Sequence, residues 1–173
     1  MKISITTAKT GCVEFRIWGS GTAAIDWGDG QIREKIKLPM PKHHHLNPVH
    51  ISHYYTEQVT RNITISGTNI IHFVCCTENE ATHLKAGENR TLKVLDCRGN
   101  KLKRLDVSNS NVLTCLDCSD NELTGESLNF LFGTLHGNEP AEGIKIIVTS
   151  GNPGAENCDE KIAMVREWNF CCR

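Results

Sequence analysis

The sequence predicts a mainly β chain with some α-helix, in which a β-sandwich-like N-terminal module is continuous with a short repeat solenoid and a helical C-terminal cap. Two observations carry this prediction. Residues 71–124 repeat with a period of 21 residues, and residues 2–65 contain short segments in which apolar and polar side chains alternate. Self-similarity at a fixed period is typical of stacked-repeat architectures, and strict alternation is typical of strands with one buried face.

The repeat consists of three consecutive 21-residue rows that begin at Ile71, Leu92 and Leu113. Each row approximates the pattern L-x-x-L-x-C-x-x-N-x-L, which is the signature of a leucine-rich repeat. A fourth row begins at Ile144, after an insertion. We expect the cysteines to serve as small buried hydrophobes and the asparagine amides to bond turn backbone groups. These structural positions are Cys76, Cys97 and Cys118, and Asn79, Asn100, Asn121 and Asn152.

The N-terminal segments precede the repeat without a linker. Alternation predicts strands over residues 2–7, 12–18, 22–27, 31–38 and 54–67, with a tight turn in Gly28-Asp29-Gly30 and a loop over residues 42–53. We expect residues 1–62 to form a module that covers the apolar end of the first repeat. Residues 63–173 then form the solenoid.

Two helices are expected to close the far end of the solenoid. Residues 125–137 carry apolar side chains at helical spacing, with Ser127 as a plausible N-cap. Residues 159–168 place Ile162, Val165 and Trp168 on one helical face. A cap is expected because the last repeat otherwise exposes apolar surface and an open sheet edge.

Composition and charge exclude several classes of partner. The 173 residues carry 19 Lys and Arg against 20 Asp and Glu, a net charge of −1 that gives no field for nucleic acid. No apolar run approaches the ~18 residues of a transmembrane segment, and residues 1–20 lack the pattern of a signal peptide. Nine cysteines do not settle the compartment. We expect no cofactor and a monomer or weak dimer.

The outward side chains of the stacked strands are the predicted binding face. Leu95 and Cys97 are expected to point inward, so their neighbours Val94, Asp96 and Arg98 point outward. Equivalent residues of successive rows line up in columns, one of which is an apolar stripe, and such stripes mark partner sites. The predicted partner-binding residues are Phe73, Val94, Asp96, Arg98, Cys115, Asp117 and Ser119.

The leading function is therefore non-enzymatic recognition of a protein or a carbohydrate. The alternative is a structural spacer or display module without its own ligand, in which the chain itself or a dimer mate covers the stripe. Catalysis is not expected, because the paired Asp96 and Asp117 are repeat consensus and Cys115 has no histidine at a matching repeat position.

Histidines and C-terminal cysteines give two further hypotheses. His43, His44 and His45 resemble a metal-binding tract, but consecutive side chains of an extended chain alternate sides, which favours a solvated loop. A disulfide from Cys158 to Cys171 or Cys172 would close a loop of about 14 residues, worth ~3 kcal/mol in the chain-entropy model. That bridge is expected only in an exported protein.

Several motifs also resemble known families. The segment from Ile25 through Trp27-Gly-Asp-Gly30, with His53-Tyr-Tyr55 and Ile63-Thr-Ile65, resembles PKD-like β-sandwich domains. The Leu95-Asp-Cys97 and Leu105-Asp-Val-Ser108 blocks resemble bacterial leucine-rich repeat proteins typical of gut Bacteroidetes. This resemblance implies an extracellular or cell-surface location, although the absence of a signal peptide here leaves a cytoplasmic one open.

Overall fold

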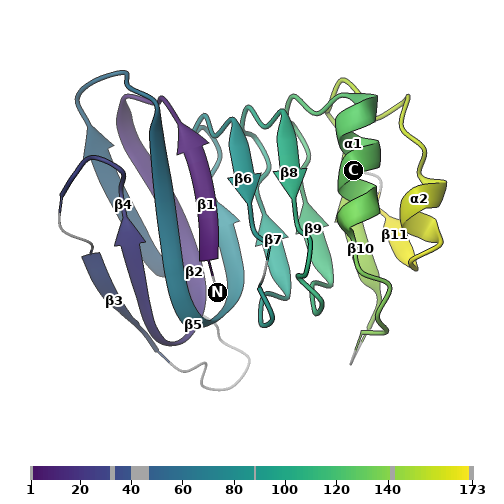
Figure 1. The fold of residues 1–173 in the computed structure, drawn as a ribbon, viewed down its shortest axis with the longest axis horizontal. Helices are drawn as coiled ribbons and strands as arrows, with labels where there is room; N and C mark the ends of the chain where they lie inside the picture. The colour runs from purple at the N-terminus through teal and green to yellow at the C-terminus, as the bar shows by residue number, and fades with distance from the viewer. Residues whose placement is uncertain (1, 32–33, 40–46, 88, 141–142, 172–173) are drawn as a thin grey trace.

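The computed structural model describes residues 2–31, 34–39, 47–87, 89–140 and 143–171, which form one mixed β-sheet with two short helices (Figure 1). The elements in chain order are β1 (Lys2–Thr7), β2 (Gly11–Asp26), β3 (Glu34–Leu38), β4 (Val49–Tyr55), β5 (Arg61–Cys75), β6 (His83–Lys85), β7 (Val94–Asp96), β8 (Arg104–Asp106), β9 (Cys115–Asp117), α1 (Gly125–Thr134), β10 (Lys145–Val148), α2 (Lys161–Met164) and β11 (Trp168–Phe170).

Two long strands, β2 and β5, organise the sheet because each contributes to two facing layers. The first half of β2 pairs with β4 on one side and with the end of β5 on the other. From the end of β5 the sheet continues through β7, β9, β10 and β11. We call this series the first layer. The second half of β2 pairs with β3 and with the start of β5, which continues through β1, β6 and β8 as the second layer.

The bend in β2 requires glycine. The pairing of β2 with β5 shifts register at Gly19 and again between Ser20 and Ala23. A Cβ atom at Gly19 would collide with the Asn69 carbonyl oxygen, and Gly21 has a left-handed φ of 86°. A side chain at either position would oppose the bend, so these glycines allow one strand to serve both layers.

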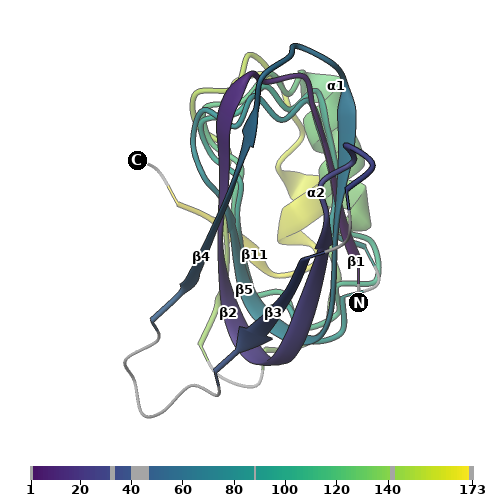
Figure 2. The same cartoon turned by 90° about the vertical axis from the view of Figure 1, so that its left-hand side faces the viewer.

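The buried apolar side chains of both layers form one cluster. Ile5 and Ile63 of the second layer belong to it together with Phe73, Leu95 and Leu116 of the first layer. Viewed along the sheet, the chain curls around this interior as a half-barrel (Figure 2). The two layers bury their inner faces against each other, and β2 and β5 join them.

The predicted fold class, a sandwich-like module followed by a leucine-rich repeat solenoid with a helical cap, is therefore wrong. The chain is one curled mixed sheet. β5 runs through the predicted boundary at residues 62/63, and β1 lies between β5 and β6. In consequence Ile63 does not neighbour Leu84, because Ile5 pairs with both of them. Antiparallel N-terminal strands thus interleave with the short parallel strands of the 21-residue rows.

The helical closure is the second correction. Residues 125–134 are helical, with Thr124 rather than Ser127 as the N-cap, since its side chain accepts from the Ser127 N–H. The second helix is a single turn, and Glu167 follows it with a left-handed φ of 63°. Val165, expected to face inward, is 77% exposed. Trp168 instead begins β11, which pairs in parallel with β10 and extends the sheet.

Two local predictions near the N-terminus also need correction. The strands expected over residues 12–18 and 22–27 are one continuous strand, β2. The loop expected over residues 42–53 includes residues 49–53, which belong to β4. The first error came from treating the glycines as a strand end, whereas the sheet pairing of β2 continues through its bend. The second came from interpreting the whole histidine-rich segment as a loop.

Candidate functional site

The outer face of the first layer carries a line of half-buried side chains that crosses five adjacent strands. Register pairing joins Trp18 to His72, His72 to Val94, Val94 to Cys115, and Cys115 to Ile146. We call these five residues the outer stripe. Each is partly exposed, and the Trp18 and His72 rings are 5.9 Å apart at a tilt of 54°. The stripe is aromatic on β2 and β5 and aliphatic or thiol-bearing on β7, β9 and β10.

The predicted first member of this line, Phe73, lies elsewhere. Phe73 pairs with Leu95, faces the core and is fully buried, while His72 occupies the outer position. The shift arises because three residues lie between the buried Cys75 and Asn79, whereas two lie between Cys97 and Asn100. For the same reason Cys75, not Cys76, is the buried cysteine of row one. A one-residue offset reverses which side chains of a strand face out.

A charged group borders the stripe on one side. Asp96 and Asp117 are register partners, and the Arg98 guanidinium lies 3.5 Å from the Asp96 carboxylate and 3.8 Å from that of Asp117. Arg16 of β2 pairs with Val74 in the same column and is exposed. The stripe therefore has an apolar centre and a rim in which both signs of charge occur.

Two other predicted binding residues are not accessible. Asp117 is 5% exposed and Ser119 is 2% exposed. The Asp117 carboxylate accepts from both the backbone N–H and the hydroxyl of Ser119. Asp96 accepts from the Arg98 N–H in the same way, 3.2 Å away. These aspartates hold the turn that follows each strand, so of the predicted set Val94, Asp96, Arg98 and Cys115 remain at the surface.

The four asparagines at the ends of the rows form an asparagine ladder, defined as Asn79, Asn100, Asn121 and Asn152. All four are buried. The Asn121 amide donates to the carbonyls of Cys97, Cys118 and Ser119, and its oxygen accepts from the Leu102 N–H at 3.0 Å. The Asn100 and Asn152 amides likewise donate to carbonyls of the preceding row, and Asn79 bonds the Glu14 backbone of β2, so the ladder is engaged inside the fold.

The buried thiols at the inner positions are donors to neighbouring strands. The Cys97 thiol donates to the Asp117 carbonyl at 3.4 Å, and the Cys118 thiol donates to the Val148 carbonyl at 3.3 Å. Burial raises the pKa of Cys97 and Cys118 well above the usual range and raises that of Cys75 to about 12. A thiol that stays protonated is a poor nucleophile, so this column does not support covalent catalysis.

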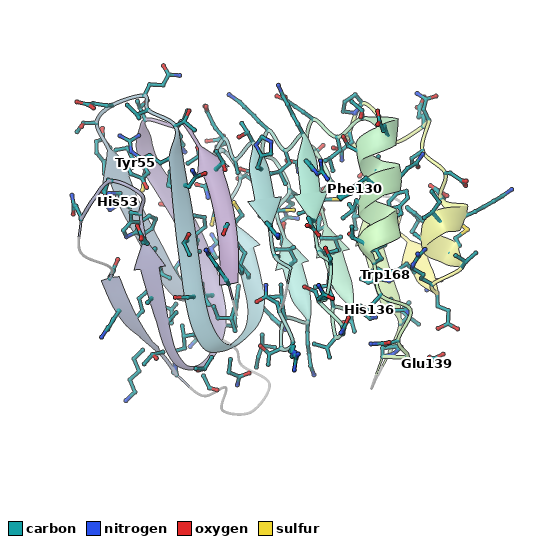
Figure 3. All side chains as sticks on the ribbon, in the orientation of Figure 1. His53, Tyr55, Phe130, His136, Glu139 and Trp168 are labelled. Atoms are coloured by element: carbon teal, nitrogen blue, oxygen red, sulfur yellow. The ribbon has the colours of Figure 1, made fainter. Side chains whose placement is uncertain are left out.

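His53 and Tyr55 of β4, labelled in Figure 3, contact the Trp-Gly-Asp-Gly turn that follows β2. His53 Nε2 lies 2.8 Å from Asp29 Oδ2, and the His53 ring stacks on Trp27 with centroids 4.7 Å apart. The Tyr55 hydroxyl donates to the Trp27 carbonyl at 2.6 Å. Burial is the main reason that the pKa of Tyr55 rises to about 12. These contacts join β4 to the turn and occupy the polar atoms of His53 and Tyr55 that make them.

Sequence reasoning missed a second group beside the stripe, centred on His136 (Figure 3). His136 Nε2 lies 2.7 Å from the Leu113 carbonyl, and the Asn138 N–H donates to Nδ1 at 3.2 Å. The Trp168 indole donates to the His136 carbonyl. His136, Glu139, Lys93 and Thr114 help to line a hollow of about 370 Å³. The sequence placed His136 at the end of a predicted helix, and that position gave no indication of these contacts.

The remaining site predictions fall partly outside the described residues. His43, His44 and His45 lie there, as does Cys172; among the described residues no group of three or more histidines, cysteines or carboxylates could hold a metal ion. The Cys158 thiol donates to the Ala155 carbonyl at 3.3 Å, and Cys171 is exposed just after β11. A bridge from Cys158 stays a prediction. No helix in the described part of the chain has the length and apolar character needed to span a membrane.

Comparison with known proteins identifies no relative: no family model, curated protein or solved structure matches the chain.

Proposed function

We propose that this protein is a non-enzymatic binding module and that the outer stripe docks a segment of a partner protein. The observation that carries the proposal is the continuity of the stripe: Trp18, His72, Val94, Cys115 and Ile146 are successive register partners on five strands. Adjacent strands are ~4.8 Å apart, so the line is roughly 19 Å long.

The chemistry of the stripe favours a protein over a glycan. Three of its five residues, Val94, Cys115 and Ile146, offer a continuous aliphatic and thiol surface, while the aromatic Trp18 and His72 lie together at one end. Arg16, Asp96 and Arg98 border it with both signs of charge. An apolar centre with a polar rim is the usual anatomy of a protein interface. An extended peptide rises ~3.3 Å per residue, so about six residues would cover the stripe.

The groups that catalysis would need are engaged in holding the fold. The Asp96 and Asp117 carboxylates bond the backbone of their own turns, and burial raises the pKa of the inner thiols. Binding needs none of these groups to change state. The resemblance to exported bacterial repeat proteins leads us to propose a bacterial cell-surface location for this binding.

A peptide-display selection tests the proposal. Random peptides would be selected on the unmodified protein and then challenged with the Val94→Glu/Cys115→Glu variant. The matched control is His83→Glu/Arg104→Glu, which places two charges on exposed register partners of β6 and β8 in the second layer. We expect the selected peptides to bind the control variant and to bind the Val94→Glu/Cys115→Glu variant much more weakly. Two carboxylates in the apolar part of the stripe would have to be desolvated on binding.

Two outcomes would count against the proposal. Peptides that bind the Val94→Glu/Cys115→Glu variant as well as the unmodified protein would locate binding elsewhere. Failure to select any peptide would support the spacer or display alternative. Circular dichroism of both variants must show the fold of the unmodified protein, since the comparison depends on intact sheets.

A further inference from the structure

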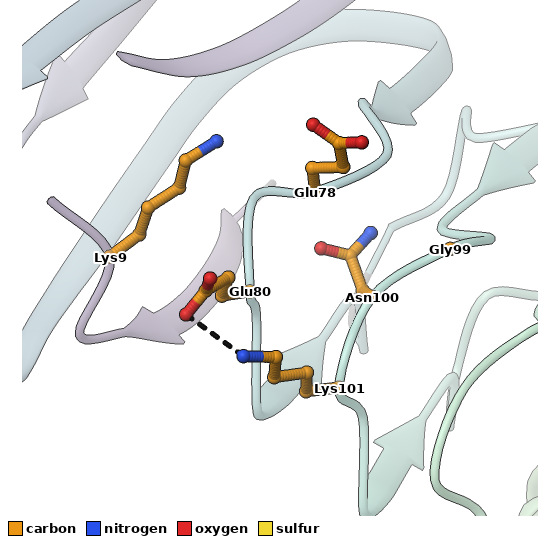
Figure 4. A pocket seen from close by; sticks show the side chains of 6 residues that line it. All are labelled: Lys9, Glu78, Glu80, Gly99, Asn100 and Lys101. Carbon is orange, nitrogen blue, oxygen red and sulfur yellow. Dashed lines mark ion pairs between the residues drawn. The ribbon is translucent and has the colours of Figure 1, made fainter. Parts of the chain in front are cut away.

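A second candidate site, independent of the outer stripe, lies where three turns converge. The turns follow β1, β5 and β7, and together they enclose a hollow of about 290 Å³ (Figure 4). Its lining residues are Lys9, Glu78, Glu80, Gly99, Asn100 and Lys101. This volume is at the lower end of the range for small-molecule sites, which limits an occupant to a small polar molecule.

The charges around this hollow are two ammonium groups and two carboxylates. The Lys101 ammonium pairs with the Glu80 carboxylate at 3.1 Å. For Lys9 and Glu78 the described residues provide no ion-pair partner within 4.0 Å. Figure 4 shows their side chains directed into the same space, one bringing a positive and the other a negative charge. One cation and one anion are therefore available to a ligand.

The backbone that carries these two charges is fixed before any ligand binds. The Thr7 hydroxyl donates to the Asn79 carbonyl at 2.7 Å and accepts from the Lys9 N–H at 3.1 Å, which ties the β1–β2 turn to the β5–β6 turn. The Glu78 N–H donates to the Gly99 carbonyl at 2.9 Å. A preformed site loses less entropy on binding than one that must be ordered.

Asn100 and Gly99 line the floor of the hollow from the turn that follows β7. The Asn100 amide is occupied by backbone carbonyls, and its oxygen accepts from the Ala81 N–H, so this side chain shapes the floor and does not serve a ligand. Gly99 has a left-handed φ of 64° at the position where the neighbouring turns carry Glu78 and Asp120. A Cβ atom at Gly99 would lie 2.8 Å from the Thr77 side chain, so glycine is needed where this turn packs against the preceding one.

Backbone conformation sets this turn apart from the later ones. Glu78 and Glu80 both have left-handed φ values, 67° and 52°. Such conformations are unfavourable for residues with a Cβ. Among the described residues, Lys101 and Glu122, which stand at the place of Glu80 in the next two turns, are not left-handed. The conformation of Glu80 is therefore particular to the turn that borders the hollow.

We propose that this hollow binds an α-amino acid zwitterion, with the ligand ammonium at Glu78 and the ligand carboxylate at Lys9. A ligand with a single charge would form an ion pair with one of these residues and would leave the other opposite an uncharged group. A zwitterion complements both at once, and charge-assisted hydrogen bonds are about twice as strong as neutral ones. The zwitterion is either a free amino acid or the two ends of a short peptide.

Isothermal titration calorimetry with the full-length protein tests this proposal. The probes are the common L-amino acids, each titrated separately, followed by the N-acetyl and methyl ester derivatives of the tightest binder. We expect binding by a free amino acid and a loss of at least about tenfold for both derivatives, since each lacks one charged hydrogen-bonding group. A diglycine arm distinguishes short peptides from free amino acids as the source of the zwitterion.

Three variants make the assignment specific. Lys9→Met and Glu78→Gln should each weaken binding by about tenfold or more. Lys103→Met is the matched control, because Lys103 pairs with Glu122 at 3.7 Å and does not line the hollow. Unchanged thermal unfolding midpoints would show that the variants are folded. The proposal is overturned by the absence of binding for every amino acid and diglycine, by equal binding of a derivative, or by unchanged affinity in either Lys9→Met or Glu78→Gln.

Discussion

Val94 on β7 and Cys115 on β9 are register partners on parallel strands, although 21 residues separate them in the chain. Both are partly exposed, and each is followed by a leucine that faces the core, Leu95 or Leu116. The same register continues to Ile146 on β10 and, with one residue of offset, to His72 on β5. Stacking therefore turns a periodic sequence into a continuous surface line, and the proposed binding function depends on that line.

The register of β5 gives the first prediction. Phe73→Ala should destabilise the fold by about 3 to 5 kcal/mol, because it removes a fully buried aromatic side chain from the core. His72→Ala should cost below about 1 kcal/mol, because its ring is half-buried on the outer face. Urea unfolding of both variants measures the difference. The reverse order would show that Phe73, not His72, is the outer residue.

The asparagine ladder gives the second prediction. Asn121→Ala should lower the free energy of unfolding by about 2 to 4 kcal/mol, since it strands buried backbone carbonyls and the Leu102 N–H. Asn111→Ala is the control, because Asn111 is exposed and lies in the turn before β9. Guanidinium unfolding of the pair tests this, and equal losses would argue against a structural role specific to the ladder.

His136 gives a pH-dependent prediction. The pKa of His136 is lowered, mainly because the ring is buried. The Lys145 charge also lowers it, whereas the hydrogen bond to the Leu113 carbonyl acts in the opposite direction. The Asn138 N–H donates to Nδ1, so only the neutral ring with its proton on Nε2 satisfies both contacts. Because the folded pKa is below the unfolded value of about 6.5, this contribution to stability is present above that pH. It is lost as the pH falls from there through the folded pKa.

The measurement compares the free energy of unfolding of the unmodified protein and of His136→Gln between roughly pH 8 and pH 5. The unmodified protein should lose more stability on acidification than the variant does. Burial also lowers the pKa of His72, but His72 is present in both proteins and its effect cancels in the difference. Parallel pH profiles would refute the role assigned to His136.

The buried thiols give a fourth prediction. Cys75, Cys97 and Cys118 should resist alkylation by iodoacetamide in the folded protein, since they are buried and burial raises their pKa. Exposed Cys12 is the internal comparison, and full labelling in denaturant is the control. Peptide mass spectrometry assigns the sites. Labelling of Cys97 at the rate of Cys12 would show that the inner column opens readily.

The 21-residue period predicted which strands of the repeat lie side by side, but the overall architecture could not be predicted from it. Leu95 and Leu116 are register partners, as equal spacing requires. The period contains no information about β1, which pairs between β5 and β6 and so makes one sheet of the whole chain. That pairing is a non-local contact, and local patterns do not encode it.

The candidate site was predictable only in part, for two physical reasons. One additional residue between Cys75 and Asn79 reverses the faces of row one, so Phe73 was placed outside and His72 was missed. Trp18 reaches the stripe from β2, which no repeat pattern includes. Alternation along the strand places Asp117 and Ser119 on the outer face, but it could not show that both are buried by the contacts within their own turn.

The affinity of one display-selected peptide for Val94→Glu, compared with its affinity for Arg104→Glu, tests the central claim most directly. We expect a loss of at least about tenfold for Val94→Glu, since a carboxylate in the apolar part of the stripe must be desolvated on binding, and no change for Arg104→Glu. Equal affinity of the peptide for Val94→Glu and for the unmodified protein would contradict the assignment of the outer stripe as the binding surface.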